Sequence, residues 1–283
     1  MITNVLEYLD QSAKRYPDKT AFADEKESCT FRELEGNSRK IGSSLAGKIK
    51  HGSPVPVFME KSVDTIAAFM GIVRAGGFYV LTDIRQPVKR LEQIIDTLEA
   101  KIMITSETYR QEVEKLEFTG EILWIEQLLQ GEVREESLEK VRRKAKDTDP
   151  LYGIFTSGST GIPKGVVVCH RSVIDFIEHF TEIFGITGED VIGNQAPWDF
   201  DVSVKDIYSG LKTGARVEII PKRMFSFPTQ LLDFLCERRV TTLIWAVSAL
   251  CIITTLRGFE YRVPNQIKKV LFSGEMMPVK HLN

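Results

Sequence analysis

The residues that point most directly to chemistry lie in the segment FTSGSTGIPKG, between Phe155 and Gly165. The segment combines hydroxyl side chains, glycines and one lysine, and its candidate anion-binding residues are Thr156, Ser157, Gly158, Ser159, Thr160, Gly161 and Lys164. Glycines have no Cβ, so their backbone amides can approach a phosphate closely, and a lysine can neutralise its charge. The segment therefore predicts an anion-binding loop. A solvent-exposed hairpin with a flexible tip is the other interpretation that remains open.

The flanking residues indicate a loop between two strands. The apolar stretch LYGIF precedes it, and the β-branched stretch GVVVCH follows it. A P-loop needs the pattern GxxxxGK[ST] running into a helix, whereas Lys164 stands between Pro163 and Gly165. Phosphate binding here would thus depend on a strand-loop-strand unit, not on a helix N-terminus.

Asp201 is the second candidate, in the segment DFDVSVKDIYSGLKTG. Apolar residues recur at helical spacing from Val204 to Leu211 and Gly214 ends the pattern, so Asp201 should lie at or just before a helix start. Aspartate is a good helix N-cap. A buried carboxylate facing a cavity would instead need a cation, such as a substrate ammonium group, to offset its desolvation. Spacing alone leaves both interpretations open.

Apolar strand-like runs alternate with amphipathic helical stretches along the chain, which predicts an α/β fold. Asn4 and Glu7 resemble a capping arrangement for a first helix that ends at Pro17. The charge-rich stretch 130–150 is expected to be a solvated connection. We expect one subdomain over residues 1–150 and a second, incomplete one over residues 151–283.

Composition narrows the function classes. The 283 residues are 43% apolar, and 37 basic against 39 acidic residues give a formal charge of -2 without a polybasic stripe. We therefore do not expect nucleic acid or a membrane as the partner, and we expect a site for a small molecule. The N-terminus lacks a signal pattern and the longest apolar run, 243–256, is too short for a bilayer, so we expect a cytoplasmic protein. The four scattered cysteines predict buried thiols, not a metal site or a disulfide framework.

A family resemblance then joins these segments. YGIFTSGSTGIPKGVVVCHRSV resembles the signature loop of adenylate-forming enzymes, the superfamily of acyl-CoA synthetases, luciferases and amino-acid adenylation domains. FDVSVKDIY and LFSGEMMP look closest to D-alanine:carrier-protein ligases and to the adenylation domains of peptide synthetases. The resemblance implies the large N-terminal domain of these enzymes, with stacked β-sheets and flanking helices.

The resemblance also implies a substrate pocket. An aspartate at position 201 would take the substrate's α-ammonium group, and the side-chain-sensing positions would be Val202, Lys205, Trp245, Leu271 and Ser273. Lys205 would favour a carboxylate or a strongly polar substrate side chain, unless it is solvated surface. Ordinary core packing is the other interpretation for Trp245 and Leu271. D-alanine ligases usually have an apolar residue at position 205 and a cysteine at 273, so D-alanine is not expected.

The implied reaction is attack of an amino-acid carboxylate on the α-phosphate of Mg²⁺-bound ATP, with transfer of the aminoacyl group to the phosphopantetheine thiol of a carrier protein. The loop 156–165 would hold the departing phosphates. The family's later segments, including its catalytic lysine and C-terminal subdomain, are not found, so we expect a truncated chain with little or no turnover. An acyl- or aryl-acid CoA synthetase fragment and a non-catalytic binding module with this fold are the alternatives.

Overall fold

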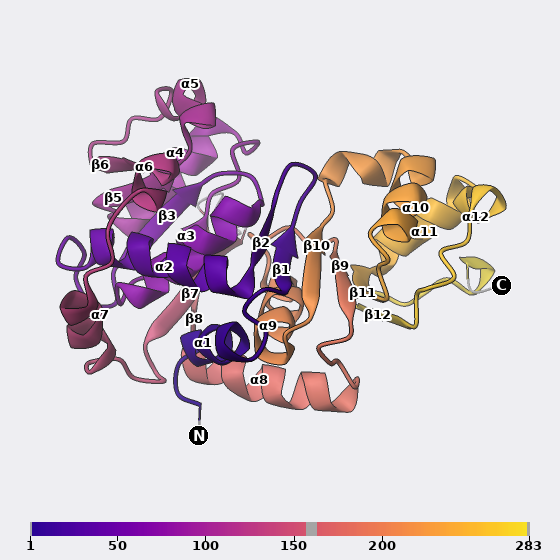
Figure 1. Cartoon of the computed structure of the whole chain (residues 1–283). Helices are drawn as coiled ribbons and strands as arrows, with labels where there is room; N and C mark the ends of the chain where they lie inside the picture. Colours follow the sequence, from indigo (N-terminus) through magenta and orange to yellow (C-terminus); the bar gives the residue numbers. More distant parts are fainter. Residues whose placement is uncertain (1, 157–162, 282–283) are drawn as a thin grey trace.

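The structure, a computed structural model, describes residues 2–156 and 163–281, and it contains two six-stranded sheets (Figure 1). The first sheet has the order β6-β5-β3-β4-β7-β8. Its strands are β3 (Pro54–Phe58), β4 (Phe78–Leu81), β5 (Ile102–Thr105), β6 (Glu121–Trp124), β7 (Pro150–Thr156) and β8 (Lys164–Cys169). All neighbours in it are parallel except the antiparallel pair of β7 and β8.

The second sheet repeats this design, with five parallel strands and one antiparallel edge strand. Its order is β12-β11-β9-β10-β1-β2. The strands are β1 (Thr20–Ala23), β2 (Ser28–Thr30), β9 (Val191–Asn194), β10 (Arg216–Ile219), β11 (Thr242–Ala246) and β12 (Lys269–Ser273). The pair of β1 and β2 is antiparallel. Crossover helices between parallel strands give the α/β class that the alternating pattern predicts, and that prediction is confirmed.

Helices surround both sheets (Figure 1). Those that follow or precede strands of the first sheet are α2 (Phe31–Leu45), α3 (Val63–Arg74), α4 (Val88–Leu98), α5 (Arg110–Val113), α6 (Ile125–Leu129) and α7 (Glu135–Arg142). Below the sheets in Figure 1 lie α1 (Leu6–Arg15), α8 (His170–Ile183) and α9 (Val204–Thr213). Towards the C-terminal end stand α10 (Pro228–Glu237), α11 (Val247–Thr255) and α12 (Gly258–Tyr261).

Local sequence signals place several of these helices as expected. At the start of α1 the Glu7 carboxylate accepts hydrogen bonds from the amides of Thr3 and Asn4 at 2.9 and 3.0 Å, and Oδ1 of Asn4 accepts one from the Leu6 amide at 2.9 Å. The predicted capping arrangement is present in part, because Val5, not Asn4, is the N-cap residue. Gly214 ends α9 with a φ of +77°, in the left-handed region that glycine adopts without strain. Asp201 begins a 3₁₀ turn, η2 (Asp201–Ser203), that leads into α9, as the spacing predicts.

One large apolar core joins the two sheets. Tyr79 of β4 and Tyr208 of α9 are both buried, and their hydroxyl groups lie 2.8 Å apart. Phe69 of α3 stacks on the Tyr79 ring with 3.9 Å between the centroids. The core thus fixes α9, the helix that follows Asp201, against the first sheet.

The stretch 130–150 is not only a solvated connection, because it contains the helix α7. Its charged residues are exposed, but Leu138 and Val141 are half-buried on one side of the helix. Leu138 lies against α2 at Gly42, where a Cβ would stand 3.3 Å from the leucine side chain. Two apolar residues at helical spacing were enough to attach this helix, which the charge-based interpretation overlooked.

The two sheets do not follow the expected division of the chain at residue 150. β1 and β2 lie before that residue but join the second sheet, where β1 pairs with β10. β7 and β8 extend past it but join the first sheet, next to β4. The strands therefore cross the boundary in both directions, and a subdomain boundary at residue 150 stays a prediction.

Two further sequence expectations concern the surface. Only Cys29 is buried, whereas Cys169, Cys236 and Cys251 are partly exposed, so the expectation of buried thiols is wrong for three of the four. These three lie at a helix start or on helix faces that are not packed into the core. No helix in the described part of the chain combines the length and apolar character needed to cross a membrane.

Candidate active site

A cavity of about 600 Å³, the Asp201 cavity, lies among the β7–β8 pair, α8, the segment leading into α9, and the ends of β11 and β12. Its lining residues include Tyr152, Val168, Ser172, Phe176, Gln195, Pro197, Asp201, Val202, Lys205, Trp245 and Ser273. Five of the six residues that the sequence assigned to substrate binding therefore surround one space. Their binding role stays a prediction.

Asp201 lines this cavity as the first residue of η2. Its carboxylate caps neither η2 nor α9, since both start without a side-chain capping bond, so the N-cap interpretation is wrong. Asp201 is exposed and not buried, because it borders an open cavity. Burial raises the pKa of Tyr152 on β7 to about 12, and the negative charge of Asp201 adds to this rise.

Lys205 lies one helical turn beyond Asp201 and lines the same cavity. Its side chain is half-buried, and Nζ donates a hydrogen bond to Oγ of Ser273 at 3.0 Å. This contact joins α9 to the end of β12, so Lys205 is not free solvated surface. Within the described residues, neither Asp201 nor Lys205 takes part in a salt bridge. The cavity thus holds two opposite charges that no side chain in the described part of the chain neutralises directly.

Trp245 and Leu271 differ from each other. Trp245 is only 2% exposed, its indole N–H donates to the Gly193 carbonyl at 2.7 Å, and one side of it lines the cavity. It is therefore a core residue that also forms cavity wall. Leu271 is half-buried, packs against the main core and is not among the lining residues.

The predicted anion-binding segment falls between β7 and β8, and the two strands predicted to flank it are confirmed. Thr156 and Lys164 are paired in register and both are exposed. Ser157, Gly158, Ser159, Thr160 and Gly161 lie outside the described residues. Tyr152 and Val168 on the same two strands line the cavity four residues away, which is about 13 Å at ~3.3 Å per residue.

A buried polar network that the sequence did not reveal lies behind the cavity. The Nζ atom of Lys61 donates to Oδ1 of Asn194 at 2.8 Å, and Nδ2 of Asn194 donates to Oδ2 of Asp206 at 2.6 Å. Burial lowers the pKa of Lys61 to about 7, and the charge of Asp206 opposes the fall. Burial likewise raises the pKa of Asp206 to about 7, opposed by the Asn194 hydrogen bond and Lys61.

A second space of about 260 Å³, the Trp198 cavity, lies across the same segment and shares Gln195 and Pro197 with the Asp201 cavity. The indole N–H of Trp198 is buried there without a hydrogen-bond partner among residues 2–156 and 163–281, and so is Oδ1 of Asp199. Neither residue was among the predicted site residues, because tryptophan and a second aspartate carry no spacing signal.

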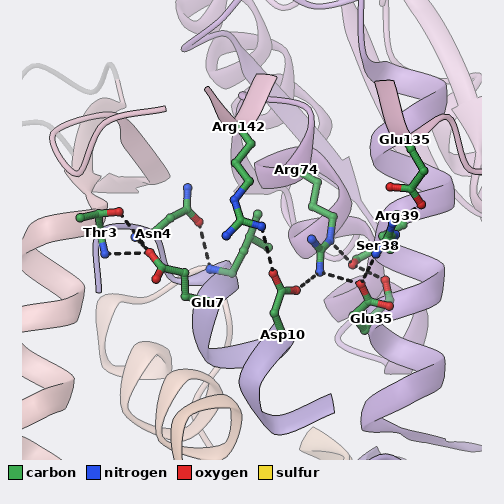
Figure 2. Close-up of polar contacts among 11 residues, drawn as sticks. Thr3, Asn4, Glu7, Asp10, Glu35, Ser38, Arg39, Arg74, Glu135 and Arg142 are labelled. Carbon is green, nitrogen blue, oxygen red and sulfur yellow. Dashed lines mark hydrogen bonds and ion pairs between the residues drawn. The ribbon is translucent and has the colours of Figure 1, made fainter. Parts of the chain in front are cut away.

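A third space, about 740 Å³ and larger than both cavities, is a groove among α1, α2, α3 and α7 that we call the Arg74 groove. Figure 2 shows that its charges face one another. Arg74 pairs with Asp10 and Glu35, and its Nε donates to Oγ of Ser38 at 2.6 Å. Arg39 pairs with Glu35 at 3.1 Å and with Glu135. Volume alone therefore does not distinguish the candidate site.

Comparison with known proteins assigns the chain to a family. The sequence profile of the AMP-binding enzymes matches residues 9–283. The chain belongs to the AMP-binding enzyme family. The predicted resemblance to adenylate-forming enzymes is thereby confirmed.

Two curated members of the AMP-binding enzyme family illustrate the relationship. The chain is 29% identical to tyrocidine synthase 1 of Brevibacillus parabrevis over 92% of its own length and 24% of that protein. It is also 29% identical to the D-alanine–D-alanyl carrier protein ligase of Bacillus cytotoxicus, over 97% of its own length and 54% of the ligase. The chain thus spans between a quarter and about half of these two relatives.

A solved structure of the family confirms the fold. The nonribosomal peptide synthetase FmoA3, in its α-methyl-L-serine-AMP-bound form, matches 98% of this chain and 31% of its own, with a TM-score of 0.87 and 26% identity. Its AMPPNP-bound form gives a TM-score of 0.86 at 26% identity, over 98% of this chain and 29% of its own. The expected architecture, two sheets with flanking helices as in adenylation enzymes, is therefore present.

Proposed function

We propose that the chain binds an amino acid and ATP for the formation of an aminoacyl adenylate. This proposal rests on two opposite charges that line the Asp201 cavity, Asp201 and Lys205, neither of which forms a salt bridge with a described residue. Asp201 would accept hydrogen bonds from the substrate's α-ammonium group, and the two opposite charges would form an ion pair inside the cavity.

The nucleotide would extend from this cavity along the β7–β8 pair. Thr156 and Lys164 offer a hydroxyl donor and a positive charge at the exposed end of that pair, which suits a polyphosphate. Mg²⁺ would accompany ATP as the counter-ion of its phosphates. The amino-acid carboxylate attacks the α-phosphorus, the bond to the bridging oxygen breaks, and pyrophosphate leaves with the electron pair. Family membership and the AMPPNP-bound form of FmoA3 support ATP as the nucleotide.

The substrate side chain would be polar, and acidic residues fit best. Lys205 Nζ stands beside the Ser273 hydroxyl, so a carboxylate in the cavity would meet one cation and one neutral donor. Val202 and Trp245 supply apolar walls for the methylene groups. D-alanine has no side-chain group that could use these donors, which makes it the poorer fit.

The acceptor of the aminoacyl group would be the phosphopantetheine thiol of a carrier protein. The name of the Bacillus cytotoxicus ligase supports a carrier as partner. A thiol needs a route to the acyl carbon other than the one that ATP occupies. A cytoplasmic location stays a prediction from the sequence.

The proposal is tested by amino-acid-dependent exchange of labelled pyrophosphate into ATP, measured with the chain joined to the C-terminal subdomain of an AMP-binding relative, against all proteinogenic amino acids and D-alanine. We expect exchange with a polar or acidic amino acid, and its loss in Asp201→Ala. Lys14→Met, a change in the Arg74 groove, is the control and should keep exchange at the wild-type level. Exchange driven equally well by simple carboxylic acids, and insensitive to Asp201→Ala, would favour an acyl- or aryl-acid synthetase instead.

A further inference from the structure

We propose that Lys61 is a positioning residue, which holds the segment between the Asp201 cavity and the Trp198 cavity in place through the carbonyl groups of Asn194, Gln195 and Ala196. The inference rests on the proposed function only where it concerns amino-acid affinity. The positioning itself is a property of the folded chain.

The Lys61 amino group meets four oxygens of one short segment. It lies 2.8 Å from Oδ1 and 3.2 Å from the carbonyl oxygen of Asn194. It lies 3.3 Å from the carbonyl oxygen of Gln195 and 3.5 Å from that of Ala196. A single amino group therefore gathers three consecutive carbonyls at the point where the chain leaves β9 and turns towards Asp201.

The two ends of this contact belong to different sheets. Lys61 follows β3 of the first sheet, and Asn194 ends β9 of the second, 133 residues away. The base of Lys61 is fixed, because Oγ of Ser62 accepts a hydrogen bond from the amide of Thr65 at 3.2 Å and caps α3. The amino group is thus presented from a rigid helix start and not from a flexible loop.

The segment after Asn194 forms the wall that both cavities share. Gln195 and Pro197 line both of them, and Oε1 of Gln195 accepts a hydrogen bond from the Ala246 amide at 3.2 Å. Lys61 thus anchors the wall from the first sheet, while the end of β11 anchors it from the second. Asn194 also donates a hydrogen bond to Asp206, the residue after Lys205, and so connects Lys61 to α9.

Loss of the amino group would remove the donor that Oδ1 of Asn194 and the Gln195 carbonyl share, while the carbonyls of Asn194 and Ala196 would keep the Ile220 amide and Nδ2 of Asn194. The wall would then be held less firmly and could open locally. Substitution Lys61→Met keeps the length and apolar stem of the side chain but removes the donor. Lys61→Arg keeps the charge and several donors. Lys48→Met removes a surface lysine that pairs with Glu121 and is the matched control.

Hydrogen–deuterium exchange of the ligand-free chain measures directly how firmly Lys61 holds this segment. In Lys61→Met we expect the amides of residues 195–201 to exchange about tenfold faster, with those of α3 within about twofold of wild type. Lys61→Arg should restore most of the protection, and Lys48→Met should match wild type. If Lys61→Met fails to fold, Lys61→Gln takes its place with the same expectation.

Unchanged exchange of residues 195–201 in a folded variant would overturn the proposal. An equal rise throughout α3, β9 and the wall would overturn it too, since Lys61 would then be a general stabilising residue. Titration calorimetry with the amino acid that drives pyrophosphate exchange adds a second readout, in which affinity should fall about tenfold in Lys61→Met and return in Lys61→Arg. A wild-type chain that binds no amino acid would count against the proposed function, while the exchange comparison would still decide the role of Lys61.

Discussion

The Arg74 groove and the Asp201 cavity are similar in volume, about 740 and 600 Å³, yet their charges are satisfied in opposite ways. In the groove, arginines and carboxylates from four helices neutralise one another (Figure 2). In the cavity, Asp201 and Lys205 form no salt bridge with any described residue and face the same space. Paired charges hold helices together, whereas charges on the wall of an open cavity are available to a charged ligand. The comparison therefore supports a structural role for the groove, and it agrees with the proposal that the cavity binds a charged substrate.

The largest expected effect follows from removing the charge of Asp201. Asp201→Asn should weaken binding of the activated amino acid about 100-fold, because an ionic hydrogen bond to its ammonium group is lost. Asp10→Asn removes a carboxylate of the same type from the groove and should leave affinity within about twofold. Titration calorimetry on the two variants compares them directly, and equal losses of affinity would erase the distinction between the two regions.

A smaller effect is expected at Lys205. Lys205→Met should lower the affinity for the acidic member of an amino-acid pair, such as aspartate over asparagine, by about 10- to 30-fold and leave the amide nearly unchanged. Lys140→Met, at an exposed pair with Glu136, is the control. The ratio of the two dissociation constants is the measurement. An unchanged ratio would mean that Lys205 only connects α9 to β12 and does not contact the substrate.

The groove should respond in stability and not in binding. Arg74 is 10% exposed and contacts two carboxylates, so Arg74→Met should lower the free energy of unfolding by about 2 kcal/mol. Arg143→Met, whose side chain is 75% exposed beside Glu139, should cost less than about 0.5 kcal/mol. Urea denaturation measures both. If folded Arg74→Met changed the amino-acid affinity by more than about threefold, the groove would not be purely structural.

The smallest effect concerns a contact between a helix of the cavity and the chain just before a helix of the groove. His170 opens α8, which lines the cavity, and its Nδ1 accepts a hydrogen bond at 3.2 Å from the amide of Val5, just before α1 of the groove. Burial lowers the pKa of His170 to about 4, so the folded protein keeps it neutral while the unfolded chain binds a proton below about pH 6.5. The contribution of neutral His170 to the free energy of unfolding is therefore complete above pH 6.5 and falls as the pH drops towards 4.

Between pH 7 and 5.5 the loss that His170 causes should be on the order of 1 kcal/mol. His170→Gln retains an acceptor for the Val5 amide but does not titrate, so its stability should fall less over the same interval. Urea denaturation at the two pH values gives the difference. Parallel losses in the wild type and His170→Gln would show that other groups cause the acid sensitivity.

The sequence predicted those parts of the molecule that depend on local patterns. The helix after Asp201 and the β7–β8 pair follow from residue spacing, and Asp201 and Lys205 share a cavity because they lie one helical turn apart. Lys61 was missed, because its partner Asn194 is 133 residues away and no local pattern links them. Helix α7 was missed because only Leu138 and Val141 stand out among its charges. The sequence also could not tell paired from unpaired charges, which depends on the packing of distant helices.

The claim that Asp201 binds the substrate ammonium group is tested most directly by a double comparison of ligand and protein. The activated amino acid and its deaminated analogue, for instance aspartate and succinate, are titrated into the wild type and Asp201→Asn. The wild type should prefer the amino acid about 100-fold, and the variant should bind both ligands within about threefold of each other. The same preference in both proteins would contradict the account, because the amine would then be recognised elsewhere.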